Sequence, residues 1–227
     1  MDSRKERRQP GYVGQWLVVA LLLLGSGILW SPISRAQTDG SSGVLLLEDF
    51  SKAEPDGFPQ GWQASRSETL TRQAYQIQHE GTQTFLKCKG VDSNVRIFKR
   101  ITWDPKTFPV ISWRWRLHGP LGGTEPFAAV FVSLDQDFFG IPVNTKYTWS
   151  PNVPKGTVID GGLFRPTQMV LRSGADQVGQ WVQERVNAYE DFKRIHKHEP
   201  APQAWGISLV AGPGVEIDFG PISASRQ

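Results

Sequence analysis

Residues 111–118 read ISWRWRLH, and this stretch decides the fold class. Alternate positions form one apolar set and one polar set: Ile111, Trp113, Trp115 and Leu117 against Ser112, Arg114, Arg116 and His118. Because successive side chains of a β-strand point to opposite faces of its sheet, the alternation predicts a strand with one face in a core. The opposite face would then carry the two arginines toward solvent.

Strand-like runs recur on both sides of this stretch, separated by Gly, Pro and Asn. With it, they number nine: residues 44–50, 84–89, 95–103, 110–117, 128–134, 146–149, 168–173, 205–210 and 215–219. Residues 128–134, AAVFVSL, are apolar on both sides, which predicts a strand covered on both faces. Many short strands with turn residues between them predict an all-β fold, a mostly antiparallel β-sandwich of the jelly-roll or galactose-binding-like kind.

One short helix is predicted in the C-terminal half of the chain, over residues 188–198. Asn187 followed by Glu190 forms an Asn-led variant of the capping box, and Pro200 follows as a stop signal. Aromatic side chains recur at helical spacing within this range: Tyr189, Phe192 and His196. We expect this aromatic stripe to pack the helix onto the sandwich.

The N-terminus has the order of features found in secretory signal peptides. Residues 4–8 are rich in Arg and Lys, residues 16–24 form an unbroken apolar run, and small residues precede a cut after Ala36. Residues 16–30 would span roughly 22 Å as a helix, against a bilayer core of about 30 Å, which disfavours a retained membrane anchor. We therefore expect a signal peptide at 1–36, a flexible tether at 37–43 and a single exported domain at 44–223, periplasmic or secreted, with no membrane contact after cleavage.

Charge and cysteine content narrow the function classes. Five of the 25 Lys and Arg residues and two of the 22 Asp and Glu residues lie in 1–36, which leaves 20 of each sign. This balance gives little reason to expect a nucleic-acid partner. Cys88 is the single cysteine, so no internal disulfide can form, and its alternating surroundings favour a buried apolar role over a nucleophile. We expect a monomer without a cofactor.

Several motifs along the chain together resemble one family. They are LEDF at 47–50 with Gly57, Pro59, Gly61 and Trp62 after it, SWRWR at 112–116, KYTW at 146–149, Gly174, and WVQER at 181–185 ahead of Asp191. Their order and spacing are similar to those of the exported bacterial proteins grouped as domain of unknown function 3047. The resemblance covers about residues 44–223 and implies no assigned activity.

The family pattern also contains polar groups that this chain lacks. The pattern has an acid pair and a later Arg on the strand after WRWR, and an Asp-rich stretch near the C-terminus. Here the corresponding positions are Glu125-Pro126, Val130 and residues 211–214, AGPG. An activity that relies on those polar groups is therefore not expected of this chain.

Arg114 and Arg116 are the first candidates for a ligand site. Two guanidinium groups about 7 Å apart on one sheet face could bind carboxylates or sugar hydroxyls through fixed donor forks. The alternative is a structural pairing of both arginines with acids on neighbouring strands. Tyr147 and Trp149 also share one side of a strand and, joined by Trp62 from a loop, could form a flat platform on which a sugar ring stacks.

Carboxylates are the candidates for catalysis, because glycoside hydrolysis needs two of them roughly 5–9.5 Å apart. Four are considered: Asp135, Asp137, Glu184 and Asp191. The first two stand at a strand end, where a turn is the simpler interpretation, and they lack the further ligands of a Ca²⁺ loop. His196 and His198 would point about 200° apart on a helix, so no metal site is expected.

These observations leave three functional hypotheses. The first is an exported sandwich that binds a carbohydrate or another small polar ligand of the cell envelope through the two arginines and the three rings. The second is a glycan hydrolase on the same scaffold, with acid and base drawn from the four carboxylates. The third is a protein-interaction or structural module. A non-enzymatic role is favoured, because no Gly-x-Ser-x-Gly, phosphate-binding Gly loop or paired Cys motif is present.

Overall fold

The computed structural model describes residues 34–35, 37–38, 43–119, 126–162 and 165–226. The predicted signal peptide at 1–36 lies almost wholly outside these residues and stays a prediction. Glu125 also lies outside them, so its place in the altered family pattern stays a prediction as well. Of the predicted tether, Gln37–Thr38 forms a short strand that pairs with the strand beginning at Val44. None of the helices in the described ranges is long and apolar enough to cross a bilayer.

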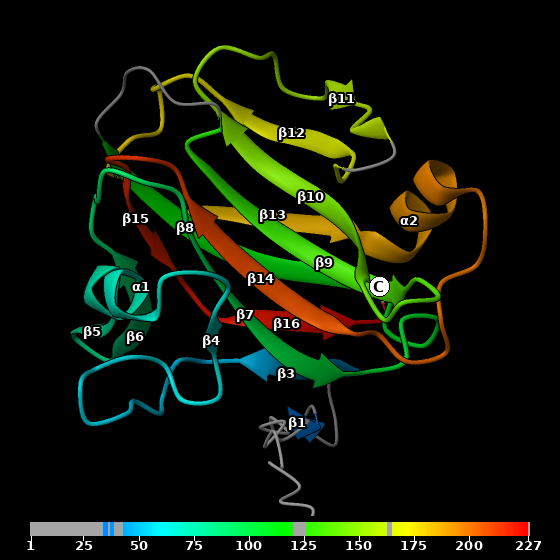
Figure 1. The fold of residues 1–227 in the computed structure, drawn as a ribbon, viewed down its shortest axis with the longest axis horizontal. Coiled ribbons are helices and arrows are strands. Elements are labelled where there is room, and N and C mark those ends of the chain that lie inside the picture. The colour runs from blue at the N-terminus through cyan, green and yellow to red at the C-terminus, as the bar shows by residue number, and fades with distance from the viewer. Residues whose placement is uncertain (1–33, 36, 39–42, 120–125, 163–164, 227) are drawn as a thin grey trace, which may run out of the picture. The chain divides into compact units, whose positions relative to one another are not determined.

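Two β-sheets form the body of the domain (Figure 1). The first contains, in spatial order, β1 (Ser34–Arg35), β7 (Val95–Thr102), β14 (Gly206–Ala211), β9 (Ala128–Gln136), β10 (Pro142–Ser150), β12 (Gln168–Ser173) and β11 (Val158–Ile159), with β4 (Gln63–Ala64) paired to β7. The second contains β2 (Gln37–Thr38), β3 (Val44–Glu48), β16 (Ile222–Ser225), β8 (Val110–Gly119), β15 (Glu216–Phe219), β6 (Gln83–Cys88) and β5 (Tyr75–Glu80), with β13 (Val182–Asn187) paired to β8. Among the described strands, only β1–β7 and β10–β12 pair in parallel, which confirms the mostly antiparallel β-sandwich.

Strand β8 has the parity that its sequence predicts. The side chains of Trp113 and Trp115 are 1% and 0% exposed, and their rings pack edge to face with centroids 5.6 Å apart. Across the core they meet two rings of β10, with Trp113 5.8 Å from Tyr147 and Trp115 5.7 Å from Trp149. These large aromatic groups hold the sheets together by apolar burial, and the same parity places Arg114 on the outer face.

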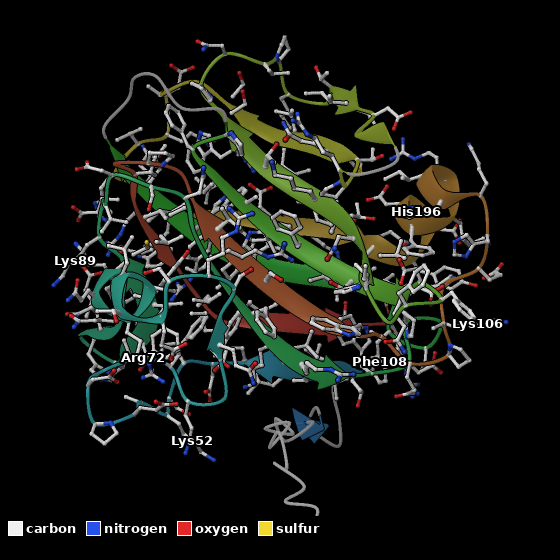
Figure 2. All side chains as sticks on the ribbon, viewed as in Figure 1. Lys52, Arg72, Lys89, Lys106, Phe108 and His196 are labelled. Carbon is white, nitrogen blue, oxygen red and sulfur yellow. The ribbon has the colours of Figure 1, made fainter. Side chains whose placement is uncertain are left out.

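The helices differ in part from the prediction. The cap of α2 (Ala188–His196) is confirmed, because the Asn187 side chain accepts a hydrogen bond from the Glu190 N–H at 3.0 Å. The helix ends two residues earlier than expected, since Lys197 adopts a left-handed φ of 62° and its N–H bonds the Lys193 carbonyl. A second helix, α1 (Glu68–Ala74), was not predicted. Figure 2 shows Arg72 of α1 and His196 of α2 at opposite ends of the sheets.

Cys88 is a buried free cysteine, as its sequence context predicts. Burial raises the pKa of its thiol to about 12, so very little of the reactive thiolate exists near neutral pH. We expect the thiol reagent DTNB to react with Cys88 about 1,000-fold more slowly in the folded protein than in concentrated guanidinium chloride at the same mildly alkaline pH. Comparable rates in the two solutions would contradict this burial.

Candidate functional site

Arg114 and Arg116 lie side by side on the outer face of the second sheet, against the ring of Trp181. The guanidinium carbons of Arg114 and Arg116 are 4.6 Å and 4.7 Å from the centroid of the Trp181 ring. Phe85 of β6 packs edge to face with Trp181 at 5.6 Å. Gln183 lies opposite Arg114 in the register of β13 with β8 and is exposed. We call Arg114, Arg116, Trp181, Gln83 and Gln183 the arginine–tryptophan face.

The two arginines differ in their polar partners. Arg116 makes ion pairs with Asp218, Nε to Oδ2 at 2.9 Å, and with Glu80, Nη1 to Oε2 at 3.0 Å. The Arg114 guanidinium donates to the side-chain oxygen of Gln83 at 3.0 Å and makes no ion pair with a described acid. Arg116 is therefore paired with acids on neighbouring strands, as the structural alternative to ligand binding predicts. Arg114, in contrast, retains a charge that no described carboxylate neutralises.

A cleft of about 380 Å³ lies at the C-terminal end of β8, and its described lining residues are Gly90, His118, Gly119, Gly214 and Glu216. The ring of His118 hydrogen-bonds through Nε2 to Asp218 Oδ2 at 2.7 Å, which fixes its orientation. Glu216 is the one carboxylate among the described lining residues, and an ion pair with Lys87 lowers its pKa. A carboxylate held ionised in this way is a poor general acid, so the described lining residues of the cleft do not include the acid pair that hydrolysis requires.

The predicted aromatic platform is not present, because its three rings are buried. Tyr147, Trp149 and Trp62 are 0%, 1% and 3% exposed. Tyr147 donates its hydroxyl to Asp191 at 3.0 Å and Trp149 donates its indole N–H to the Gly174 carbonyl at 3.0 Å. Both side chains point into the core because burying the apolar ring is favourable, and the one polar atom of each ring has a hydrogen-bond partner there.

Trp62 has a structural role at the edge of the sandwich. Its indole N–H donates to Glu48 Oε2 at 2.8 Å, and the Lys99 ammonium bonds the same oxygen at 2.7 Å. This pair also explains why Lys99 interrupts the apolar positions of β7, since the lysine reaches a carboxylate instead of the core. Trp62 is therefore unavailable for stacking on a ligand.

The four carboxylates considered for catalysis are engaged by different partners. Asp137 accepts the backbone N–H groups of Phe139 and Ile141 at 2.9 Å and 2.8 Å, which confirms a turn. Asp135 Oδ1 accepts the neighbouring Gln136 N–H at 2.7 Å. The other two lie elsewhere: Asp191 pairs with Arg194 at 2.7 Å, and Glu184 pairs with Arg172 at 2.6 Å. Each of the four acids has partners of its own, and none of them is among the described residues that line the cleft.

The two histidines near the end of α2 pack on one aromatic side chain. The rings of His196 and His198 lie 4.4 Å and 5.2 Å from the Phe192 ring, and 6.3 Å from each other. Burial lowers the pKa of His196, which favours its neutral form. Across the described residues, no group of three or more His, Cys, Asp or Glu is placed to hold a metal ion.

The structure also gathers cations on the outer face of the first sheet, which the sequence analysis did not single out. Arg96 and Arg100 of β7 lie on this face with Phe131 of β9 and Lys146 of β10. The signal available in the sequence was the alternation of residues 95–101, which places both arginines opposite the core side. Their cross-strand neighbours depend on the strand order, which the sequence does not reveal.

The chain is similar to several solved structures, each at low sequence identity. One is the K1 cleaved adhesin domain of Lys-gingipain from Porphyromonas gingivalis W83, at 11% identity and a TM-score of 0.43 over 82% of this chain and 99% of that one. Another is the carbohydrate recognition domain of Emp47p, at 13% identity and a TM-score of 0.43 over 83% and 99%. A third is TmCBM61 in complex with β-1,4-galactotriose, at 9% identity and a TM-score of 0.38 over 79% and 99%.

None of the curated proteins matches the chain. A family match does exist, and it falls on the part of the chain that runs from the β9–β10 turn to the end of β14. Residues 140–211 match the model of the family described as Protein of unknown function (DUF3047), which confirms the resemblance over this range, where the motifs at 146–149 and 181–185 lie.

Proposed function

We propose that this protein is an exported, monomeric binding module for a carbohydrate or another hydroxyl-rich ligand of the cell envelope. The ligand would lie on the arginine–tryptophan face. The observation that carries the proposal is the position of Arg114, whose guanidinium lies on the Trp181 ring with Gln83 as its hydrogen-bond partner and no described acid to neutralise it. Its remaining N–H donors are in a fixed plane, which suits pairs of adjacent hydroxyl oxygens.

The polar groups around Arg114 favour a neutral ligand over a strongly charged one. Gln83 and Gln183 both donate and accept hydrogen bonds, as sugar hydroxyls do, and both are exposed. Glu80 and the buried Asp218 offset the charge of Arg116 on the same face. A polyanion would meet these carboxylates, whereas a neutral glycan can match donors and acceptors together and place a ring against the indole edge.

A protein-interaction role is the second candidate, and the turn between β9 and β10 favours it. Phe138 and Phe139 are 96% and 82% exposed, and Ile141 is 59% exposed. The hydrogen bonds to Asp137 fix the turn that presents these side chains. Exposed apolar groups on a rigid turn are typical of contact sites for another macromolecule.

A glycan array followed by calorimetry with the best-binding glycan tests the first proposal. We expect Arg114→Ala to weaken binding about 10- to 100-fold, because a hydrogen bond to a charged group contributes about 1.5–3 kcal/mol. Trp181→Ala should weaken binding as well, through loss of the ring that orients both guanidiniums. Arg66→Ala, an exposed arginine in the loop before α1, is the matched control and should bind as the wild type does. Absence of binding to every glycan class, or full affinity of the Arg114 variant, would overturn the proposal.

A further inference from the structure

The outer face of the first sheet carries aromatic and cationic side chains in one cross-strand row. The register joins five strands in this row: Phe98 of β7, Ser208 of β14, Phe131 of β9, Lys146 of β10 and Gln168 of β12. Arg96 and Arg100 flank Phe98 on β7, two residues to either side. We call Arg96, Phe98, Arg100, Phe131 and Lys146 the cationic face. In Figure 1 this sheet is nearest the viewer, and no helix lies in front of β14, β9 or β10.

Aromatic rings hold the cations of this face in place. The guanidinium carbon of Arg96 lies 4.4 Å from the centroid of the Phe131 ring, and the Lys146 ammonium lies 5.9 Å from the same centroid. The guanidinium carbon of Arg100 lies 5.2 Å from the ring centroid of Trp205, which also contacts Phe98 at 5.8 Å. These contacts order the long side chains before any ligand arrives, which lowers the entropic cost of binding.

The two arginines of this face have no acidic partner among the described residues. Over the part of the chain that the structure describes, neither Arg96 nor Arg100 makes an ion pair, whereas Arg72, Arg116, Arg172 and Arg194 all do. Arg96 donates to the Ser208 hydroxyl at 2.9 Å, but its Nε has no partner and is buried, as is the Nε of Arg100. Burial lowers the pKa of Arg96, and no described negative charge opposes this effect. A charge that is desolvated and left without a counter-ion is stabilised when an anion binds.

We propose that the cationic face is a second binding site, which takes an acidic polysaccharide through its carboxylate or sulfate groups. The backbone positions of Arg96 and Arg100 are four residues apart on one strand, about 13 Å, and the backbone position of Lys146 is three strands away, about 14 Å across the sheet. The charged groups of Arg96 and Lys146 approach the Phe131 ring, whereas the Arg100 guanidinium lies against the Trp205 ring. An extended chain with repeated negative groups can contact both of these cationic positions. The proposal does not rest on the arginine–tryptophan face, which lies on the other sheet and carries acids.

A nucleic acid or an anionic membrane fits these observations less well. Phe131 is 6% exposed and has the Arg96 guanidinium against its ring, so no nucleobase can stack there. Residues 37–227 have as many acidic as basic side chains, which gives none of the broad positive field that attracts a polyphosphate or a lipid surface. An acidic polysaccharide also places apolar ring faces between its charged groups.

The test measures binding of the purified protein to five probes in low salt. Polygalacturonate and dextran sulfate carry the two anionic groups, neutral dextran is the uncharged control, and oligo-dT and phosphatidylglycerol vesicles represent the other sources of anions. We expect the protein to bind one or both acidic polysaccharides, and added salt should weaken this binding. Neutral dextran should not bind to the cationic face. Tighter binding to oligo-dT or to the vesicles than to either polysaccharide would overturn the proposal.

Three variants locate the site. Arg100→Gln should lower the affinity for the acidic polysaccharide about tenfold, and Arg96→Gln with Arg100→Gln about 100-fold, because each arginine supplies one charge-assisted contact. Arg100→Gln removes no hydrogen bond to a described residue, so it should fold normally even if the double variant does not. Arg114→Gln on the other sheet is the matched control and should keep full affinity for the polyanion.

The outcomes separate the two proposed sites. Loss of polyanion binding with Arg114→Gln, or full affinity in the Arg100 variant, would overturn the second site. If the wild-type protein binds no neutral glycan, the proposed function is overturned, but the result for the polyanion still stands. Circular dichroism of each variant confirms that a change in affinity is not a change in fold.

Discussion

Glu184→Ala is expected to lower the free energy of unfolding by about 3–5 kcal/mol, the usual cost of breaking a buried ion pair from one side. The Glu184 side chain is 7% exposed. Its Oε1 accepts from the Trp115 indole N–H at 3.0 Å and from the Arg172 Nε at 2.6 Å. Removing the carboxylate leaves a buried N–H group and a half-buried guanidinium without their acceptor. Urea denaturation followed by tryptophan fluorescence measures the change.

Glu190→Ala is the matched control for this substitution. Glu190 lies on α2, where it is 60% exposed and 3.8 Å from the Lys193 ammonium. Its removal should change the free energy of unfolding by less than about 1 kcal/mol. Equal stability of the two variants would contradict the structural role assigned to Glu184. A large effect also means that any activity lost with Glu184 cannot be attributed to catalysis before stability is measured.

Trp115→Ala is expected to destabilise the protein by at least about 3–5 kcal/mol, as deletion of a buried aromatic ring does. The ring is 0% exposed and contacts Trp113 and Trp149 from two strands in different sheets. Its loss opens a cavity between the sheets and removes one hydrogen bond from Glu184. Scanning calorimetry should show a much lower melting temperature, or no cooperative transition at all.

A double-mutant cycle connects the two substitutions. Trp115→Phe keeps most of the ring and removes the indole N–H, so it should cost less than Trp115→Ala. Combined with Glu184→Ala, it should cost less than the sum of the two single changes, by about 0.5–3 kcal/mol, because the two groups share a hydrogen bond. Strict additivity would show that the Trp115–Glu184 hydrogen bond contributes nothing to stability.

Much of the fold could be predicted because its main strands alternate clearly. All nine predicted runs are strands, and the cap at Asn187 begins α2 as expected. Strand β13 was missed, although its burial alternates, because its inward positions include Glu184, a charged residue at a core position. Strand β5, YQIQHE, is too polar to stand out, and its neighbour α1 is only seven residues long.

The site was harder to predict, because its chemistry depends on which strands are neighbours. Parity correctly put Arg114 and Arg116 outside, but the ion pair with Asp218 requires β15 to lie beside β8. The prediction of an aromatic platform was wrong for a different reason. The alternation of residues 146–149 shows that Tyr147 and Trp149 share one side of a strand, yet it cannot say which side faces the second sheet. Only the contacts with Trp113 and Trp115 decide that question.

The concealed sulfhydryl of Cys88 makes the natural chain a convenient host for site-specific labelling. Since it is the single cysteine and lies in the core, a maleimide dye added to the folded protein finds no native target. A cysteine introduced at an exposed position such as Lys52, labelled in Figure 2, would be the one reactive group. Fluorophores or spin probes can therefore be attached near either outer face without first engineering a cysteine-free background.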